Sequence, residues 1–235
     1  MTADEIVKQI KPLGRDSYKK VLLNHGVKEP VFGVKIEELK KIQKLVKKDY
    51  QLALALYDTG IYDAMYLAGL IADDPKMTKT DLRAWVKKAN CYPISESTVP
   101  WVAAEGNHGH ELAIEWIASK QEGVAAAGWA TLRNLVALKD DADLDISELK
   151  HLLQQVQKTI HQQPNRVRYA MNSFVIGVGS YVRGLTELAL QTAARIGPVS
   201  VEMGGTSCRV PSAAEYIQKT QKRGAIGKKR KTVKC

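Results

Sequence analysis

Hydrophobic residues recur along most of this chain at steps of three and four positions, the spacing of one face of an α-helix. Leu39, Ile42, Leu45 and Val46 form one such stripe, and longer stripes run through residues 146–160 and 167–178. The alternation typical of β-strands is hard to find before about residue 198. The pattern predicts an all-α protein of roughly ten to twelve helices. Each helix needs a neighbour to cover its apolar stripe.

Helix start and stop signals divide these stripes. Thr2 with Glu5 and Asp145 with Glu148 have the spacing of a capping box, in which each side chain bonds the backbone at the position of the other. Prolines fall between stripes, where a missing backbone N–H costs least. These prolines are Pro75, Pro93, Pro100 and Pro164.

Many short amphipathic helices without a central sheet favour antiparallel helix pairs stacked side by side, as in HEAT-type solenoids. No repeat of fixed period can be written, so a compact irregular helical bundle stays open as an alternative. The small residues at 125–130 (AAAGWA) would let neighbouring helices approach closely in either arrangement.

The last forty residues follow a different pattern. β-branched residues flank Gly204-Gly205, which suits either a small β-hairpin over residues 198–210 or a loop. Ser212 and Glu215 mark the start of a further helix, and Gly224 marks its end. We expect a repeat domain over residues 1–195. The hairpin, helix and basic arm of residues 196–235 are expected to pack on it or extend from it.

The carboxyl-terminal residues carry most of the net charge. Residues 209–235 hold nine basic residues and one acidic residue, a net charge of +8 out of +10 for the whole chain. A basic arm on a nearly neutral body binds phosphates, because each neutralised phosphate releases condensed counterions. Nucleic acid is therefore the expected partner, and we expect a flexible arm after Gly224. The predicted DNA-binding residues are Lys219, Lys222, Arg223, Lys228, Lys229, Arg230, Lys231 and Lys234.

A basic segment of this kind also fits roles other than nucleic-acid binding. It could be a solvated tail that raises solubility, or a nuclear-import signal. An anionic membrane surface fits less well, since the segment has no interleaved aromatic residues and no lipidation motif. The amino terminus is polar, and the apolar runs are too short to span a bilayer. These features predict a cytoplasmic protein, and the three cysteines, Cys91, Cys208 and Cys235, are expected to be free thiols.

Metal and cofactor sites are not expected. His108 and His110 are two residues apart and do not share a helical face, and no Cys-x-x-Cys occurs. The glycines of GVGSYVRG (177–184) lack the Gly-Lys-Ser/Thr ending of a phosphate loop, so they indicate close helix packing.

Residues 90–101 (NCYPISESTVPW) are the best candidate for catalytic chemistry. They place Tyr92, Glu96 and Trp101 together between two prolines. In the structural interpretation, Glu96 only occupies the first turn of a helix capped by Ser95.

Three stretches together resemble a known family. They are FGVKIEELKKIQK (32–44), LRAWVKKANCYPISESTVP (82–100) and ELAIEWIASKQEGVAAAGWATLRNL (111–135). Their order resembles that of the HEAT-like-repeat DNA alkylation repair proteins, the AlkD-like alkylpurine DNA glycosylase superfamily. The resemblance covers roughly residues 14–190 and is distributed along the chain rather than concentrated in one signature.

The resemblance implies a curved solenoid that binds duplex DNA on a basic concave face. It implies removal of N3- or N7-alkylated purines with a carboxylate near the sugar. Glu96 falls where the family has its catalytic aspartate, and Tyr92 where it has a tryptophan. Ala126 and Ser173 fall where the family has a phosphate-binding arginine and a second tryptophan.

Three functions therefore remain open. The first is a glycosylase that uses Glu96 and Tyr92. The second is a non-catalytic protein that recognises damaged or branched DNA by shape. The third is a protein-binding helical scaffold.

Overall fold

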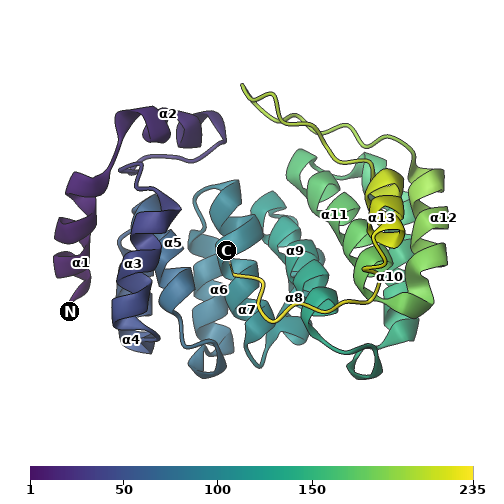
Figure 1. The fold of residues 1–235 in the computed structure, drawn as a ribbon, viewed down its shortest axis with the longest axis horizontal. Helices are drawn as coiled ribbons and strands as arrows, with labels where there is room; N and C mark the ends of the chain where they lie inside the picture. The colour runs from purple at the N-terminus through teal and green to yellow at the C-terminus, as the bar shows by residue number, and fades with distance from the viewer. Residues whose placement is uncertain (235) are drawn as a thin grey trace. The chain divides into compact units, whose positions relative to one another are not determined.

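The computed structural model describes residues 1–234, and these residues are helical with no β-strand (Figure 1). The prediction of an all-α fold is confirmed. Residues 1–234 contain thirteen α-helices, slightly more than expected. They are α1 Ala3–Ile10, α2 Asp16–Asn24, α3 Ile36–Val46, α4 Tyr50–Asp58, α5 Tyr62–Ile71, α6 Lys79–Lys88, α7 Val99–Glu105, α8 Gly109–Ile117, α9 Glu122–Leu138, α10 Ile146–Thr159, α11 Asn165–Tyr181, α12 Thr186–Ile196 and α13 Ala213–Lys222.

Short helical turns separate several of these helices. The 3-10 turns are η1 Lys11–Leu13, η2 Asp74–Lys76, η4 Asp141–Asp143, η5 Ile160–Gln162 and η6 Arg183–Leu185, and a π-helical turn, η3, spans Ile94–Thr98. Within the described residues, no helix is both long and apolar enough to cross a membrane.

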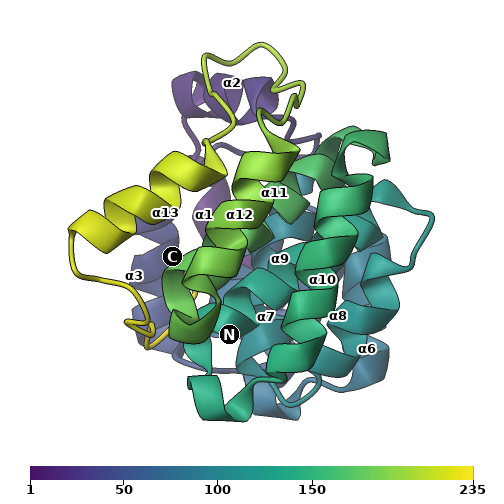
Figure 2. The same cartoon turned by 90° about the vertical axis from the view of Figure 1, so that its right-hand side faces the viewer.

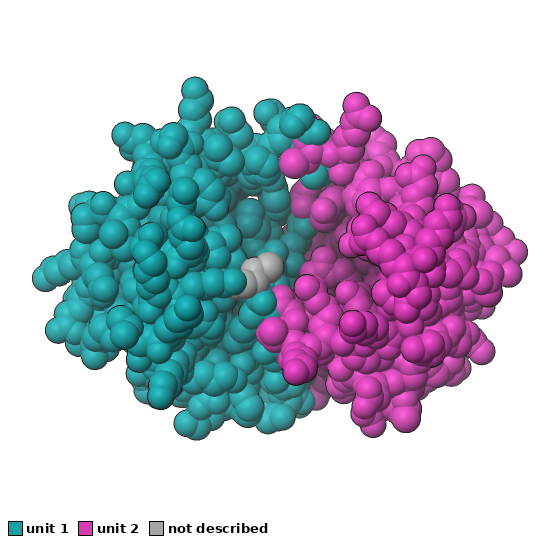
Figure 3. All heavy atoms as spheres, viewed as in Figure 1, with its two compact units in different colours: residues 1–108, 203–207, 234 teal, residues 109–202, 208–233, 235 magenta. Residues whose placement is uncertain are grey.

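The chain folds into two compact units (Figure 3). Unit 1 contains residues 1–108 together with residues 203–207 and Lys234. Unit 2 contains residues 109–202 and 208–233. Cys235 lies outside the described residues, so the expectation for its thiol stays a prediction.

The predicted caps fix several helix starts. The Thr2 hydroxyl accepts a hydrogen bond from the Glu5 N–H at 3.2 Å, and the Glu5 carboxylate accepts one from the Thr2 N–H at 2.7 Å. Asp145 caps α10 by accepting from the Glu148 N–H. Ser212 caps α13 in the same way through the Glu215 N–H. Each side chain satisfies a backbone donor that has no partner inside its helix.

The core of unit 1 is built around α5, which is buried along its entire length. Helices α3 and α4 pack against it, and Tyr57 of α4 stacks on Trp85 of α6 with ring centroids 4.1 Å apart. Leu39 and Ile42 of the predicted α3 stripe are buried, but Leu45 is 72% exposed. The prediction was wrong for Leu45, since the covered face of this helix is narrower than the apolar stripe.

A buried carboxylate holds the turn that precedes α3. Asp63 of α5 is fully buried and accepts hydrogen bonds from the backbone N–H groups of Phe32, at 2.6 Å, and Val34, at 2.7 Å. Gly33 lies between them with a φ of +78°, which favours glycine. Burial raises the pKa of Asp63, although these backbone hydrogen bonds oppose the shift.

The core of unit 2 is formed by α9 and α11, with α8 beside α9 and α13 beside α11. Figure 2 shows α10 next to α12 in this unit. A Cβ atom on Gly128 would lie 2.7 Å from the Ile117 backbone nitrogen, so α8 and α9 touch at their backbones. Gly179 of α11 likewise accommodates Ile217 of α13, whose Cδ1 would lie 2.4 Å from an added Cβ. These contacts confirm that the small residues at 125–130 and 177–184 serve close helix packing.

The hairpin suggested for residues 198–210 does not form. Gly204 has the positive φ of a tight turn, but the flanking residues are not paired as strands. The side chain of Asn165 instead binds the backbone of Glu202, accepting from its N–H at 2.7 Å and donating to its carbonyl at 2.9 Å. A helix side chain thus takes the hydrogen bonds that a strand ladder would have used.

The segment after Gly224 is not the flexible arm that we expected. The Gly227 N–H donates to the Ser180 carbonyl at 2.9 Å, and the Arg230 N–H donates to the Ala137 carbonyl at 2.8 Å. Val233 is buried, with 4% of its surface exposed. Contacts with helices distant in sequence therefore hold the backbone of this segment in unit 2.

We predict that Asp63→Asn destabilises the protein by about 2 kcal/mol, because one carboxylate oxygen becomes an NH₂ donor facing a backbone donor. Chemical denaturation measures this loss. Asp58→Asn is the matched control, since Asp58 forms a largely exposed ion pair with Lys88 at 2.7 Å. That control should cost less than about 1 kcal/mol. Equal losses in the two variants would contradict the role given to Asp63.

Candidate nucleic-acid interface

Residues 90–101 leave regular α-helical geometry in unit 1. The Val99 N–H donates to the carbonyl of Ile94, five residues earlier, which closes the π-helical turn η3. Pro100 follows in the first turn of α7 and has no N–H, so the carbonyl of Glu96 cannot receive the ordinary α-helical bond. The proline therefore explains why the chain adopts a wider turn here. Turns of this kind are frequent at functional sites.

The structure buries Glu96 and places Tyr92 just before it. Glu96 lies in the middle of η3 with 8% of its surface exposed. The Ser95 hydroxyl donates to the Tyr92 carbonyl at 3.3 Å, and no side chain caps η3. Glu96 does lie in the first turn of a helical segment, as the structural interpretation had it, but the capping by Ser95 is wrong, because no side chain caps η3.

The ring of Tyr92 packs against the backbone of Gly26. A Cβ atom on Gly26 would lie 2.3 Å from the Tyr92 ring, and Gly26 has a φ of +74°. Only glycine meets both conditions without strain. The turn after α2 thus fixes one face of the predicted site residue.

Helix α5 brings a row of aromatic residues to η3. Tyr62, Tyr66 and Gly69 are spaced as one helix face, and an added Cβ on Gly69 would lie 2.4 Å from Cγ2 of Thr98. Tyr66 meets Trp101 edge to face, with ring centroids 5.4 Å apart. Burial, with a smaller effect of Cys91, raises the pKa of Tyr62 far above its ordinary value, so its hydroxyl stays neutral.

The candidate catalytic region therefore contains Glu96, Tyr92 and Trp101 together with Tyr66 of the facing helix α5, which sequence reasoning missed. The signal for Tyr66 was its position one helical turn before Gly69, the glycine that touches η3.

The predicted DNA-binding residues fall into two groups in the structure. Most are exposed. Helix α13 is held on α11 by the fully buried Ile217. The exposed residues of this group are Lys219, Lys222, Arg223, Lys228, Arg230 and Lys231, all in unit 2.

Two of the predicted DNA-binding lysines have partners inside the protein. The Lys229 Nζ lies 2.8 Å from Asp141 Oδ1 and donates to the Val136 carbonyl at 2.9 Å, all within unit 2. The Lys234 Nζ lies 2.6 Å from Asp74 Oδ1 in unit 1. A buried carboxylate such as Asp74 requires a cation nearby. The ammonium groups of Lys229 and Lys234 are therefore paired within the protein, and their side chains are less exposed than those of the other six predicted residues.

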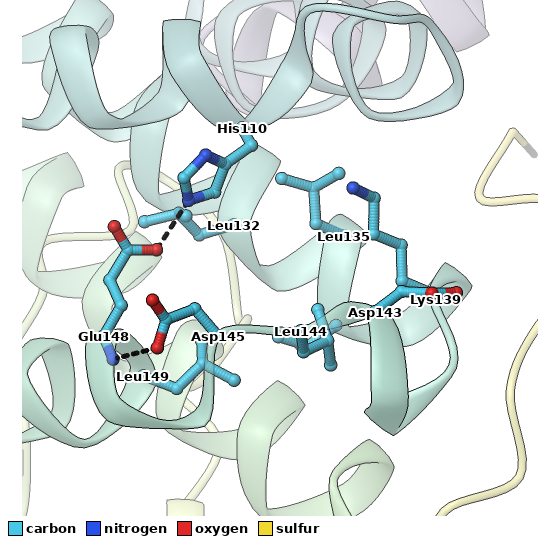
Figure 4. A pocket seen from close by; sticks show the side chains of 10 residues that line it. His110, Leu132, Leu135, Lys139, Asp143, Leu144, Asp145, Glu148 and Leu149 are labelled. Carbon is cyan, nitrogen blue, oxygen red and sulfur yellow. Dashed lines mark hydrogen bonds and ion pairs between the residues drawn. The ribbon is translucent and has the colours of Figure 1, made fainter.

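A small pocket of about 220 Å³ lies in unit 2 (Figure 4). Four leucines are among its lining residues, and His110 Nε2 lies 2.5 Å from Glu148 Oε2 in the same lining. Among residues 1–234, no group of three or more histidine, cysteine or acidic side chains is placed to hold a metal ion.

The two positions at which the resemblance implies different residues are both buried. Ala126 of α9 is fully buried, and Ser173 of α11 is 8% exposed. An arginine at position 126 would have to displace neighbouring core atoms before it reached a phosphate.

Comparison with known proteins identifies the family. The DNA alkylation repair enzyme family matches residues 6–217. The chain belongs to this family. Uncharacterized protein Lin0241 of Listeria innocua is 30% identical over 229 residues, which cover 95% of this chain and 99% of the relative. Uncharacterized protein Lmo0209 of Listeria monocytogenes is 29% identical over the same shares.

A solved structure matches this member of the DNA alkylation repair enzyme family along its whole length. The match has 36% identity, a TM-score of 0.93 and full coverage of both chains. That structure represents "a new family of proteins related to the HEAT-like repeat DNA glycosylases with affinity for branched DNA structures". The fold of this DNA alkylation repair family member is thus a HEAT-like helical repeat, as the sequence predicted.

We predict that Gly69→Ala destabilises the protein by about 1 to 3 kcal/mol, because the new methyl group collides with Thr98 Cγ2. Thermal or chemical denaturation measures the loss. Adding Thr98→Ser removes Cγ2 and should restore much of the stability. Gly184→Ala is the control, since nothing lies within 4 Å of an added Cβ there. A double variant that is no more stable than Gly69→Ala would refute the contact.

Proposed function

We propose that this protein binds branched DNA through its backbone phosphates and recognises the shape of the branch rather than its base sequence. Membership of the DNA alkylation repair enzyme family supports DNA as the partner. The affinity for branched DNA stated for the structural neighbour supports the branched form. The observation that carries the proposal is the group of exposed basic residues on α13 and the segment that follows it.

The physical basis is electrostatic. Six exposed cations between Lys219 and Lys231 lie within a short stretch of unit 2. A DNA branch brings the phosphates of several arms close together, so a compact cationic surface neutralises more of them there than on one straight duplex. Such contacts position the protein without reading bases.

The absence of two side chains expected of a glycosylase favours DNA binding over removal of alkylated bases. The resemblance implied an arginine on a phosphate and a second aromatic residue against the sugar, and this chain has Ala126 and Ser173 there, both buried. Two of the four side chains expected of a glycosylase are therefore absent.

A glycosylase is the second candidate, favoured by the geometry of η3. A nearly buried Glu96 in a π-helical turn, with Tyr92 before it and Tyr66 on the facing helix, resembles a preorganised catalytic carboxylate. In that reaction the bond between the alkylated purine and C1′ breaks as Glu96 stabilises the positive charge on the sugar. The electrons of that bond leave with the alkylated purine, which departs as a neutral base. Water then adds to C1′ and releases its proton to solvent. Glutamate is one methylene longer than aspartate, and errors near 1 Å can reduce the rate by about a hundredfold.

If the protein recognises the branch, it should bind a four-way DNA junction at least about tenfold more tightly than a straight duplex that has the base sequence of the junction's arms. This is a difference of roughly 1.4 kcal/mol in binding free energy. Fluorescence anisotropy at fixed salt measures both affinities.

A second junction of the same geometry but unrelated base sequence is the control for this experiment. It should bind with the same affinity within about twofold, because phosphate contacts carry no sequence information. Equal affinity for junction and duplex would contradict recognition of the branch. A strong preference between the two junctions would contradict recognition by shape.

The glycosylase candidate is tested by incubating excess protein with duplex that contains 7-methylguanine or 3-methyladenine and measuring free base. If the chain is an enzyme, base is released and Glu96→Gln lowers the rate by about a hundredfold or more. Glu37→Gln, which changes an exposed glutamate, should leave the rate unchanged. The absence of release from both lesions would exclude this candidate for those lesions.

A further inference from the structure

We propose that residues 228–233 form an ordered phosphate-binding strap in which Lys229 is an internal anchor and Lys228, Arg230 and Lys231 contact DNA. We call this segment the basic strap. The inference rests on the proposed function, because it assigns the phosphate contacts of the same DNA-binding surface. The proposal also gives different roles to neighbouring basic residues that the sequence analysis predicted to bind DNA alike.

The backbone of the basic strap is fixed at both sides of Lys229. Before it, the Gly227 N–H binds the Ser180 carbonyl of α11, and after it the Arg230 N–H binds the Ala137 carbonyl of α9. Gly227 has a φ of +74°, and an added Cβ there would lie 2.4 Å from Cγ of Arg183. The chain therefore reaches the strap through a turn that only glycine fits.

Lys229 itself points into unit 2. Its side chain is only 15% exposed, and its Nζ reaches both Asp141, at 2.8 Å, and the Val136 carbonyl, at 2.9 Å. Asp141 is held in turn, since its Oδ2 accepts from the Arg183 N–H at 3.1 Å. A lysine whose ammonium group is used in this way is poorly placed to reach a phosphate.

The neighbours of Lys229 are not buried in the same way. Lys228, Arg230 and Lys231 are exposed. The strap therefore presents three cations on a backbone that is already held by hydrogen bonds to Ser180 and Ala137. A free arm would lose conformational entropy on binding, about 1 kcal/mol or more per ordered residue, whereas the basic strap has lost it on folding.

The order of the strap is tested without DNA. We expect hydrogen exchange of the Gly227 and Arg230 amides to be slowed at least about tenfold relative to an unstructured peptide, because both donate hydrogen bonds within the protein. Lys229→Gln should speed exchange at Arg230, while Lys228→Gln should not. Exchange at the unstructured rate in the unmodified protein would overturn the strap.

The division of roles is tested with these two variants on the four-way junction. They remove the same charge at adjacent positions. Lys228→Gln should lower the affinity and reduce the slope of log K against log salt by about 0.9, the value for one lost phosphate contact. Lys229→Gln should lower the affinity with little change of slope. No phosphate contact is lost in this variant, but the loosened strap must become ordered when DNA binds.

A second pair of variants separates the anchoring of Lys229 from the effect of net charge. Asp141→Asn and Asp140→Asn each raise the net charge by one, and long-range attraction alone predicts that both bind DNA more tightly. Only Asp141 contacts Lys229. We therefore expect Asp141→Asn to bind less tightly than Asp140→Asn by about threefold or more, which corresponds to roughly 0.7 kcal/mol. Thermal denaturation of both variants checks that the fold is retained.

These outcomes separate the strap from the proposed function. Equal slope changes in Lys228→Gln and Lys229→Gln would make Lys229 a phosphate contact and overturn the division. Junction binding that neither lysine variant alters would overturn the strap and leave the proposed function intact. If the unmodified protein binds no DNA, both the proposed function and the phosphate role fail, and the exchange data alone then decide whether the strap is ordered.

Discussion

The structure depends on close approach between helices that have no sheet to cover them. In this chain the approach is made at glycines. Gly69 lets α5 touch the turn that holds Glu96, Gly128 joins α8 to α9, and Gly179 receives Ile217 from α13. Because a methyl group at any of these positions would overlap a neighbouring atom, both candidate functional regions depend on this packing. One is the carboxylate turn in unit 1, and the other is the basic surface on unit 2.

The two regions are suited to different kinds of recognition. Glu96 is nearly buried in a turn that a proline keeps out of α-helical geometry, where a carboxylate can act only on a group brought against it. Six of the basic residues that follow Ile217 are exposed, and backbone hydrogen bonds hold the segment that carries the last three of them, which suits phosphates approached from solvent. A family member can lose the chemistry of the first region and keep the binding of the second.

Much of the fold could be predicted because helical periodicity and caps are local. The stripe at 167–178 and the caps at Thr2 and Asp145 appear in the structure as the sequence indicated. The sequence left a hairpin or a loop open over residues 198–210, and the loop forms, because the partner of Glu202 is Asn165, 37 residues earlier. A local pattern carries no information about such a partner.

The candidate functional residues were less predictable than the helices, because their contacts also join distant parts of the chain. Composition marks residues 228–234 as basic but cannot show that Lys229 pairs with Asp141 and Lys234 with Asp74, since these contacts join distant parts of the chain. The buried Asp63 and the aromatic row of α5 were likewise visible only once the helices were packed. Tertiary contacts decide which charges of a basic run remain available to a ligand.

The central claim is that exposed cations of the basic strap hold the phosphates of a DNA branch. The most direct measurement is the salt dependence of junction affinity for a triple variant, Lys228→Gln, Arg230→Gln and Lys231→Gln, which leaves Lys229 in place. The control replaces three other exposed lysines of unit 2, Lys120, Lys150 and Lys158, by glutamine. We expect the slope of log K against log salt to fall by about 2.7 in the strap variant and to change little in the control. Equal changes in the two variants, or no change in the strap variant, would contradict it.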